Sequence, residues 1–436
     1  MAGSFPTVAG GVLKGVAIVV AAASLAPAPA WGRAGALDRS FGQRGIVRTS
    51  FGPASSATAQ AVALTRGGRV VVAGQAQTGQ GSTVMAVARY KPSGALDRSF
   101  GSGGLVQTAF AQGGGPALAV AVDGRGRTIV AGSSGNDFAV ARYTPRGRLD
   151  RSFGSGGEVV TSFPGLEVNA QAIALLPNGS TVVGGGGSRS DGTGGGFALV
   201  RYRSGGALDR SFGTQGRVFT PFGAGADVSG VHALALWRGR VIAAGLLDDP
   251  FGGGGAFALA RYTGSGQLDS SFSGDGRVTT VLGQEAGAQG VLVVPGGRIV
   301  AAGAAQPMPG QGDRFALTRY LSNGTLDSSF GQAGIVSTNL PGGDALGNAI
   351  AGQRDGRLVV AGQANQPDGT TSIFGMARYL SGGALDTSFG SGGIVTTSFG
   401  KGLMAAANGV AIQHNGRIVV VGSNGSIFIV ARYLAS

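Results

Sequence analysis

The stretch Ala88–Val106, which reads ARYKPSGALDRSFGSGGLV, decides the fold because close copies of it recur along the whole chain. Its Arg-Tyr pair occurs seven times, 53 to 60 residues apart, at Arg89, Arg142, Arg201, Arg261, Arg319, Arg378 and Arg432. Its Leu-Asp-x-Ser-Phe element also occurs seven times, at Asp38, Asp97, Asp150, Asp209, Asp269, Asp327 and Asp386. A repeat of about 58 residues indicates a propeller, a solenoid or an array.

Each repeat contains four short apolar runs bounded by Gly, Asn, Asp or Pro, which is the pattern of β-strands. In the first full repeat we expect strands at Ala61–Leu64, Arg69–Ala73, Met85–Tyr90 and Leu96–Val106. Four-stranded sheets repeated around an axis are the blades of a propeller. The sequence therefore predicts an all-β, seven-bladed β-propeller of antiparallel strands over residues 35–436.

The two ends of the repeat region predict how the propeller closes. The chain enters the pattern in the fourth strand, at Leu37–Phe41, and leaves it after the third, at Tyr433. We expect the N-terminal strand to complete the last blade, which would cover an edge that could otherwise pair with another chain.

The repeats resemble the bacterial delta-60 repeat family. The resemblance rests on the pattern Asp-Gly-Arg-Ile-Val-Val-Ala-Gly, then Phe-x-Leu-Ala-Arg-Tyr, then Gly-x-Leu-Asp-x-Ser-Phe-Gly, over about Gly35 to Tyr433. It implies an architecture similar to NHL-type propellers and no shared activity.

The N-terminus differs in composition from the repeats. Residues 1–30 contain Lys14, the apolar run Gly15–Ala26 and the small residues Ala28 and Ala30, which together are typical of a secretory signal peptide. We expect export to the extracellular space or the cell envelope, with residues 31–34 as a short leader. No later segment approaches the ~18 uninterrupted apolar residues of a membrane helix, so no transmembrane segment is expected after signal removal.

Catalytic motifs are not recognisable in the chain. Cysteine is absent, which excludes disulfides, thiolate metal sites and a cysteine nucleophile. His232 and His414 lack zinc-binding spacing, and no helical period is present to support a serine nucleophile on a strand-to-helix turn. We expect no enzyme activity, no cofactor and no metal, and we interpret the repeated Arg and Asp, such as Arg89 and Asp97, as structural ion pairs.

The first residue of each innermost strand is polar in six of seven repeats. These residues are Gln60, Leu118, Gln171, His232, Gln289, Asn348 and Asn408. In a propeller they would form a ring at one mouth of the central channel. Two interpretations remain open: the amides bond to one another and to trapped water, or they bind a ligand.

The loops predict two faces of opposite charge. Because successive strands are antiparallel, the variable loops share one side and the short, uniform turns the other. The variable loops contain 10 of the 21 acidic residues but only 3 basic ones; the acids include Asp191, Asp248, Asp249, Asp313 and Asp368. The net charge is +13, so the uniform side should be basic. We name as the basic arc the arginines that follow Leu-Asp in four consecutive copies: Arg39, Arg98, Arg151 and Arg210.

These features favour an exported binding or scaffolding propeller. Its partner, a protein, a carbohydrate or a cell-envelope polymer, would meet the variable loops, where function usually lies on a rigid frame. The alternative is a propeller hydrolase or lyase with a polar site at the channel mouth. Specific nucleic-acid binding is not expected, because the basic arc lacks aromatic residues for base stacking.

Overall fold

Runs of Val, Ala and Ile between glycine turns become antiparallel β-strands. The computed structural model describes residues 33–52, 56–79, 81–111, 113–189, 194–222, 228–248 and 255–436. The expected signal peptide, residues 1–30, lies outside them. In this described part, the fold is all-β and propeller-like, and the helical structure consists of the single 3₁₀ turn Pro295–Gly297.

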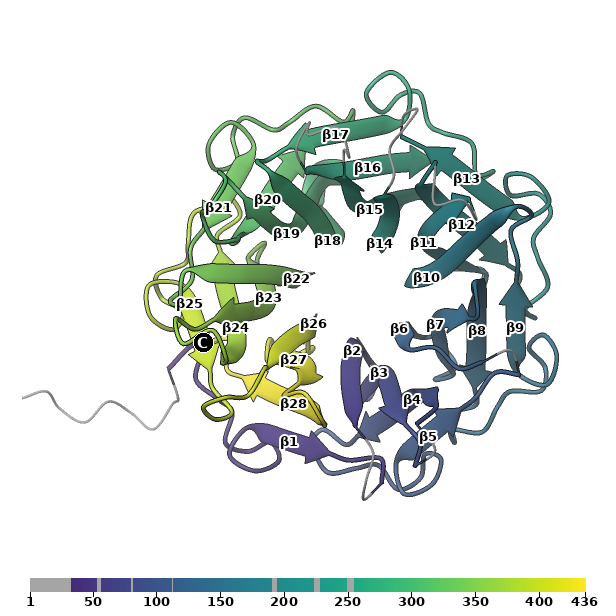
Figure 1. The fold of residues 1–436 in the computed structure, drawn as a ribbon, viewed down its shortest axis with the longest axis horizontal. Helices are drawn as coiled ribbons and strands as arrows, with labels where there is room; N and C mark the ends of the chain where they lie inside the picture. The colour runs from purple at the N-terminus through teal and green to yellow at the C-terminus, as the bar shows by residue number, and fades with distance from the viewer. Residues whose placement is uncertain are drawn as a thin grey trace, which may run out of the picture. The chain divides into compact units, whose positions relative to one another are not determined.

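Each repeat contributes an innermost strand, and Figure 1 shows these strands gathered around a common centre. They are β2 (Ala57–Leu64), β6 (Ala117–Val122), β10 (Leu166–Leu175), β14 (Val228–Trp237), β18 (Glu285–Val294), β22 (Asp344–Gly352) and β26 (Ala406–Ile412). The second strands are β3 (Val70–Gln77), β7 (Thr128–Ser134), β11 (Thr181–Arg189), β15 (Arg240–Asp248), β19 (Arg298–Gln306), β23 (Leu358–Asn365) and β27 (Ile418–Ser423).

The third strands end in the repeated Arg-Tyr pair. They are β4 (Thr83–Tyr90), β8 (Asp137–Tyr143), β12 (Gly196–Tyr202), β16 (Ala256–Tyr262), β20 (Arg314–Tyr320), β24 (Ser372–Tyr379) and β28 (Phe428–Tyr433). The outer strands are shorter. They are β1 (Ile46–Thr49), β5 (Leu105–Thr108), β9 (Glu158–Thr161), β13 (Arg217–Pro221), β17 (Arg277–Val281), β21 (Ile335–Thr338) and β25 (Ile394–Thr397).

The strands pair in groups of four in sequence order. β2–β5, β6–β9 and β22–β25 form separate sheets. β10–β21 form three such groups that are joined through two single-residue pairings, Gly186 with Gly230 and Leu246 with Gly287. The remaining sheet has the order β1-β28-β27-β26, so the expected pairing of the N-terminal strand beside the strand ending at Tyr433 is confirmed (Figure 1).

The predicted strand bounds in the first full repeat were wrong at several ends. The second strand is Val70–Gln77 rather than Arg69–Ala73, and the third begins at Thr83 rather than Met85. The innermost strand begins at Ala57 rather than Ala61, because its pairing with β3 continues on the other side of an irregularity at residue 60. The outer strand does not extend over Leu96–Val106, since only Leu105–Thr108 is strand. Between Asp97 and Leu105 the chain forms tight turns. The Phe100 amide donates to the Asp97 carbonyl, and the Gly104 amide donates to the Phe100 carbonyl. Gly104 has a φ of 106°, a conformation that favours glycine.

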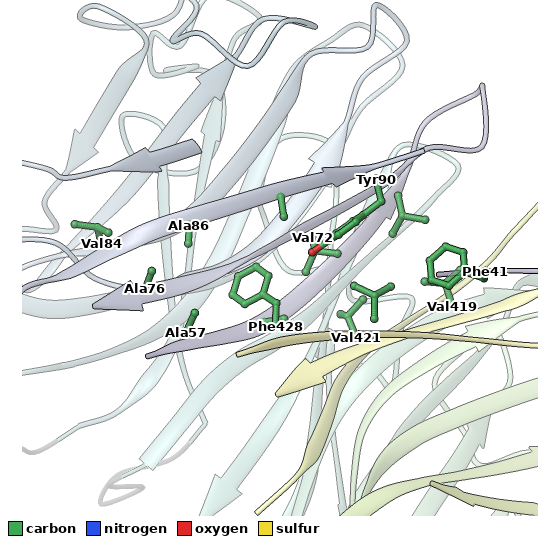
Figure 2. Close-up of a cluster of buried hydrophobic side chains, with 14 residues drawn as sticks. Phe41, Ala57, Val72, Ala76, Val84, Ala86, Tyr90, Val419, Val421 and Phe428 are labelled. Carbon is green, nitrogen blue, oxygen red and sulfur yellow. The ribbon is translucent and has the colours of Figure 1, made fainter. Parts of the chain in front are cut away.

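The hydrophobic core lies between neighbouring repeats. One cluster joins Val72 and Ala57 of the first sheet to Val421 and Phe428 of the last (Figure 2). Burying each such Val or Phe side chain contributes roughly 1.5–3 kcal/mol, so packing between sheets is a main source of stability. Within the described residues, no helix is both long and apolar enough to cross a membrane.

Candidate functional site

The innermost strands surround a cavity of about 390 Å³. All seven residues of the predicted polar ring line its wall: Gln60, Leu118, Gln171, His232, Gln289, Asn348 and Asn408. Apolar residues that follow them, such as Val62 and Leu234, complete the lining. The structure thus brings together side chains that are about 60 residues apart in sequence.

A β-bulge in each innermost strand positions its ring residue. The pairing of β2 with β3 skips from Ala59 to Ala61, so Gln60 has no partner residue in the ladder, and the same shift occurs at the ring position of all seven strands. A bulge redirects a side chain, here toward the cavity. The prediction that these are the first residues of their strands was wrong, since the strands begin one to five residues earlier.

A glycine opposite each bulge makes this geometry possible. A Cβ atom on Gly74 would lie 2.0 Å from the carbonyl oxygen of Thr58, two residues before the bulge. The equivalent glycines are as close, at 1.6–1.9 Å: Gly132, Gly185, Gly245, Gly303, Gly362 and Gly422. This recurring glycine at the end of the second apolar run was the sequence signal for the bulge.

Some ring amides link neighbouring repeats. Asn408 Nδ2 donates to the carbonyl of Ala59 at 2.9 Å, and Asn348 Nδ2 donates to the carbonyl of Ala407 at 3.1 Å. Gln171 Nε2 instead donates to Asn169 Oδ1 on its own strand, at 2.9 Å. The first interpretation, in which ring amides satisfy neighbouring polar groups, therefore applies to part of the ring.

His232 is the titratable member of the ring. Burial lowers the pKa of its imidazole, and a hydrogen bond with the Gln289 side chain offsets only part of this effect. Its Nδ1 atom is buried and has no hydrogen-bond partner among the described residues. The imidazole is therefore neutral near pH 7 and can present a donor or acceptor to a ligand.

A second cavity, of about 230 Å³, shares Gln289 with the central one and is acidic. Glu285 and the predicted loop acid Asp313 line it. Burial raises the pKa of Asp313, and the nearby carboxylates of Asp344 and Glu285 raise it further. Asp344 Oδ1 accepts from the Asp313 amide at 2.9 Å. Sequence reasoning did not select Glu285 or Asp344 as site residues, because only the fold brings their loops together.

The other predicted loop acids do not join this cavity in the described residues. Asp368 is held in its own turn, where its carboxylate accepts from the amides of Thr370 and Thr371. Asp191 and Asp249 lie outside the described residues, as does the side chain of Asp248. No group of three His, Asp or Glu side chains in the described part of the chain could hold a metal ion.

The repeated Arg and Asp form the predicted ion pairs in all seven repeats. The arginine Nε donates to the aspartate Oδ2 at 2.8–2.9 Å throughout. The guanidinium also lies over the Phe of Leu-Asp-x-Ser-Phe, 4.4–4.7 Å from the ring centre, and donates to a carbonyl of the following repeat, as Arg89 does to Pro145. The repeated arginines and aspartates therefore stabilise the repeats by binding one another, and their role is structural.

The basic arc lies at the surface. Arg39, Arg98, Arg151 and Arg210 are all exposed, each one residue after a paired aspartate. The register places them toward the uniform turns, because the turn at Leu64–Val70 and the end of β4 at Tyr90 lie at the same end of the sheet.

Sequence comparison finds a family model that matches segments of the repeats. Six segments match a β-propeller repeat family of unknown function. The family is described as "Domain of unknown function (DUF5122) beta-propeller", and the matched residues are 68–100, 126–153, 176–212, 239–272, 295–330 and 353–389. Every DUF5122 segment ends at the Phe that lies under the paired arginine. No curated protein matches the chain significantly.

Solved structures resemble the chain in fold. The WD40 β-propeller domain of Doa1 has a TM-score of 0.46 and 11% identity, covering 88% of this chain and 94% of that one. A polysaccharide lyase, the PL25 ulvan lyase, has a TM-score of 0.47 and 10% identity over 86% and 90%. A carbohydrate-active enzyme of family AA12 from Trichoderma reesei has a TM-score of 0.39 and 12% identity over 88% and 96%.

Proposed function

We propose that this protein is a binding propeller that holds a small, polyhydroxylated ligand such as a sugar in the central cavity. The observation that carries the proposal is that bulges in the innermost strands aim carboxamide and imidazole groups at one cavity. A carboxamide both donates and accepts hydrogen bonds, so it can match both roles of a sugar hydroxyl. Small-molecule sites typically combine such a few polar groups with an apolar lining.

Calorimetric titration of the protein with neutral mono- and oligosaccharides tests this proposal. Gln60→Ala and Gln289→Ala should each weaken binding by roughly five- to tenfold, the value of about one hydrogen bond. Gln332→Ala, which changes an exposed glutamine in an outer turn, is the matched control. Binding that is unaffected by both cavity variants would contradict the proposal.

A second candidate function, a sugar hydrolase or lyase, is favoured by one observation. Asp313 and Glu285 line one small cavity, and burial and the nearby carboxylates of Asp344 and Glu285 raise the pKa of Asp313, which is the direction that general acid catalysis requires. Assays of polysaccharide cleavage test it. Asp313→Asn should abolish cleavage, whereas Asp368→Asn should not. If the wild-type protein cleaves no polysaccharide, the enzymatic function is excluded and only the binding function remains.

We further propose that the DUF5122 segments are delta-60 repeats and that the seven repeats close into a seven-bladed propeller. Contacts between the first and last repeats support closure. β2 contacts β26, and the Arg432 guanidinium donates to the Pro92 carbonyl at 2.5 Å, as the other six arginines do to the repeat that follows them. The pairing of β1 with β28 gives the last sheet its fourth strand.

Export and surface attachment complete the proposal. The signal-like sequence of residues 1–30 supports secretion, which N-terminal sequencing of the secreted protein would test. The exposed basic arc would hold the protein against an anionic cell-envelope polymer or lipid surface, leaving the variable loops outward. Binding to anionic vesicles should fall between low and physiological salt, and fall further when the four arginines become serine. Salt-insensitive binding would exclude this role for the arc.

A further inference from the structure

A cavity of about 660 Å³ lies away from the centre, between the second and third repeats. Its walls are the turn between β6 and β7, at residues 123–127, and the turn between β10 and β11, at residues 176–179. The turn at residues 204–205, which follows β12, closes one side. The cavity therefore belongs to the uniform face and is separate from the central site.

Side chains bridge the equivalent turns elsewhere on this face. Gln413 Nε2 donates to the carbonyl of Gly68 at 3.3 Å, and Arg354 contacts His414 Nδ1 at 2.7 Å. Trp237 lies so close to Gly297 that a Cβ there would meet its ring at 2.4 Å. Between the second and third repeats the turns instead enclose a hollow.

The hollow is lined by four arginines: Arg66, Arg125, Arg127 and Arg142. Asp123 pairs with Arg127 at 2.6 Å, and Asp150 pairs with Arg142 at 2.8 Å. These two carboxylates leave an excess of two positive charges. Arg66 and Arg125 are exposed, and within the described part of the chain neither guanidinium has an ion-pair partner. Two guanidinium groups are therefore free to bind an anion.

The other residues that line the cavity indicate which kind of molecule bears the anionic group. Leu175, Leu176 and Pro177 supply apolar lining from a different turn than Arg66 and Arg125, and Asn178 and Ser204 supply groups that bond hydroxyls. Among the described residues, no aromatic side chain lines the cavity, so they offer no platform on which a nucleobase could stack. The apolar face of a sugar ring fits the apolar lining, and guanidinium groups match phosphate or carboxylate with two parallel hydrogen bonds.

We propose that this cavity is a second binding site, specific for an anionic sugar that carries a phosphate or a carboxylate. The sugar's acidic group meets Arg66 and Arg125, and its ring lies against Leu175 and Pro177. This site does not depend on the ligand proposed for the central cavity.

Calorimetric titration of the full-length mature protein at low salt tests the site with four probes: glucose 6-phosphate, glucuronate, glucose and inorganic phosphate. We expect the first two to bind, and their relative affinities to distinguish a phosphosugar from a uronate site. Arg66→Ala and Arg125→Ala should each weaken binding roughly ten- to a hundredfold, as expected for a charged hydrogen bond.

Arg238→Ala is the matched control, because Arg238 is an exposed turn arginine of the same face that does not line the cavity. Gln289→Ala, in the central cavity, should also leave anionic-sugar binding unchanged. If Arg238→Ala weakens anionic-sugar binding as much as Arg66→Ala and Arg125→Ala do, the effect comes from general surface charge and the proposal is overturned. Failure of both anionic sugars to bind would overturn it as well, as would equally tight binding of glucose or of inorganic phosphate that Arg66→Ala and Arg125→Ala weaken to the same extent.

Discussion

At the scale of single residues, the aspartates of Leu-Asp-x-Ser-Phe are centres of charge compensation. Burial alone would raise the pKa of Asp269, but the hydroxyl of Ser271 and the guanidinium groups of Arg240 and Arg261 lower it to about 2. The second arginine stands at the start of the second strand or one residue before it, and six of the seven aspartates pair with such an arginine in the described structure. One carboxylate thus holds three elements together.

Asp269→Asn should destabilise the protein by about 3–5 kcal/mol, because it leaves the buried guanidinium of Arg261 without a counter-charge. The matched control is Asp355→Asn, which breaks an exposed pair with Arg357 and should cost about 1 kcal/mol or less. Urea unfolding measures both. Similar losses in the two variants would contradict the structural role of the buried pair.

Stability should fall in acid because all seven of these aspartates have pKa values below their ordinary range. A lowered carboxyl pKa contributes stability that is complete above the unfolded value of about 4, and that is lost as pH falls through the folded value. The free energy of unfolding should decrease between about pH 4 and pH 2. Among the described residues Asp313 and Glu158 act in the opposite sense, because their pKa values are raised, but they are two groups against seven. Urea unfolding at several pH values measures this free energy. A free energy of unfolding that does not change between about pH 4 and pH 2 would contradict the prediction.

His232 should titrate below the ordinary histidine value of about 6.5, because burial lowers its pKa. Its contribution to stability is complete above pH 6.5 and decreases as the imidazole becomes protonated in acid. Proton NMR can follow the imidazole directly, since the chain has two histidines and His414→Ala identifies the second signal. A midpoint at or above 6.5 would place His232 in water rather than in the cavity wall.

At the scale of elements, the bulge in each innermost strand connects fold and site. It turns one side chain per strand toward the cavity. It also brings the carbonyl of the residue two positions earlier, Thr58 in the first repeat, against a glycine of the second strand. Each innermost strand therefore contains one break in its pairing, and the seven bulge residues together form the polar wall of the cavity.

Gly74→Ala should destabilise the protein by about 2 kcal/mol or more, because the added methyl would overlap the Thr58 carbonyl and force the strands apart. Gly79→Ala, in the same repeat, has open space around its Cβ position and should be nearly neutral. Thermal unfolding compares the two. If Gly74→Ala is tolerated as well as Gly79→Ala, the bulge does not require glycine.

At the scale of the whole molecule, the first and last repeats are held by the same interactions as consecutive ones. Tyr90 of the first repeat donates to Thr49 of the last sheet at 2.8 Å. Within the last sheet, Asp38 accepts from Arg432 at 2.9 Å, as Asp97 does from Arg89 in the first repeat. The hydrophobic cluster of Figure 2 joins the same two repeats. The N-terminal segment therefore belongs to the last sheet although it is the start of the chain.

Deletion of residues 37–51 should lower both the melting temperature and the solubility. It removes the partner strand of β28 and leaves Arg432 without Asp38, and a free strand edge pairs readily with other chains. Size-exclusion chromatography and thermal unfolding measure the two effects. Deletion of residues 1–30 is the control for chain shortening, because it leaves β1 and Asp38 in place. A deletion of 37–51 that stays monomeric and equally stable would contradict the closure that we propose.

Sequence patterns were enough to predict the repeat, the order of its four strands, the Arg-Asp pairs and the residues of the polar ring. These follow from local patterns, because alternation reports burial and turn residues report strand ends. The tertiary structure alone decided that Gln60 and its equivalents sit on bulges within their strands, and that the stretch Leu96–Gly104 is turn rather than strand. It also decided that Glu285 and Asp313 share one cavity and that Arg66 and Arg125 face another. The physical reason is that register shifts and cavities arise from packing between repeats, and such contacts join residues too distant in sequence for any local pattern to report.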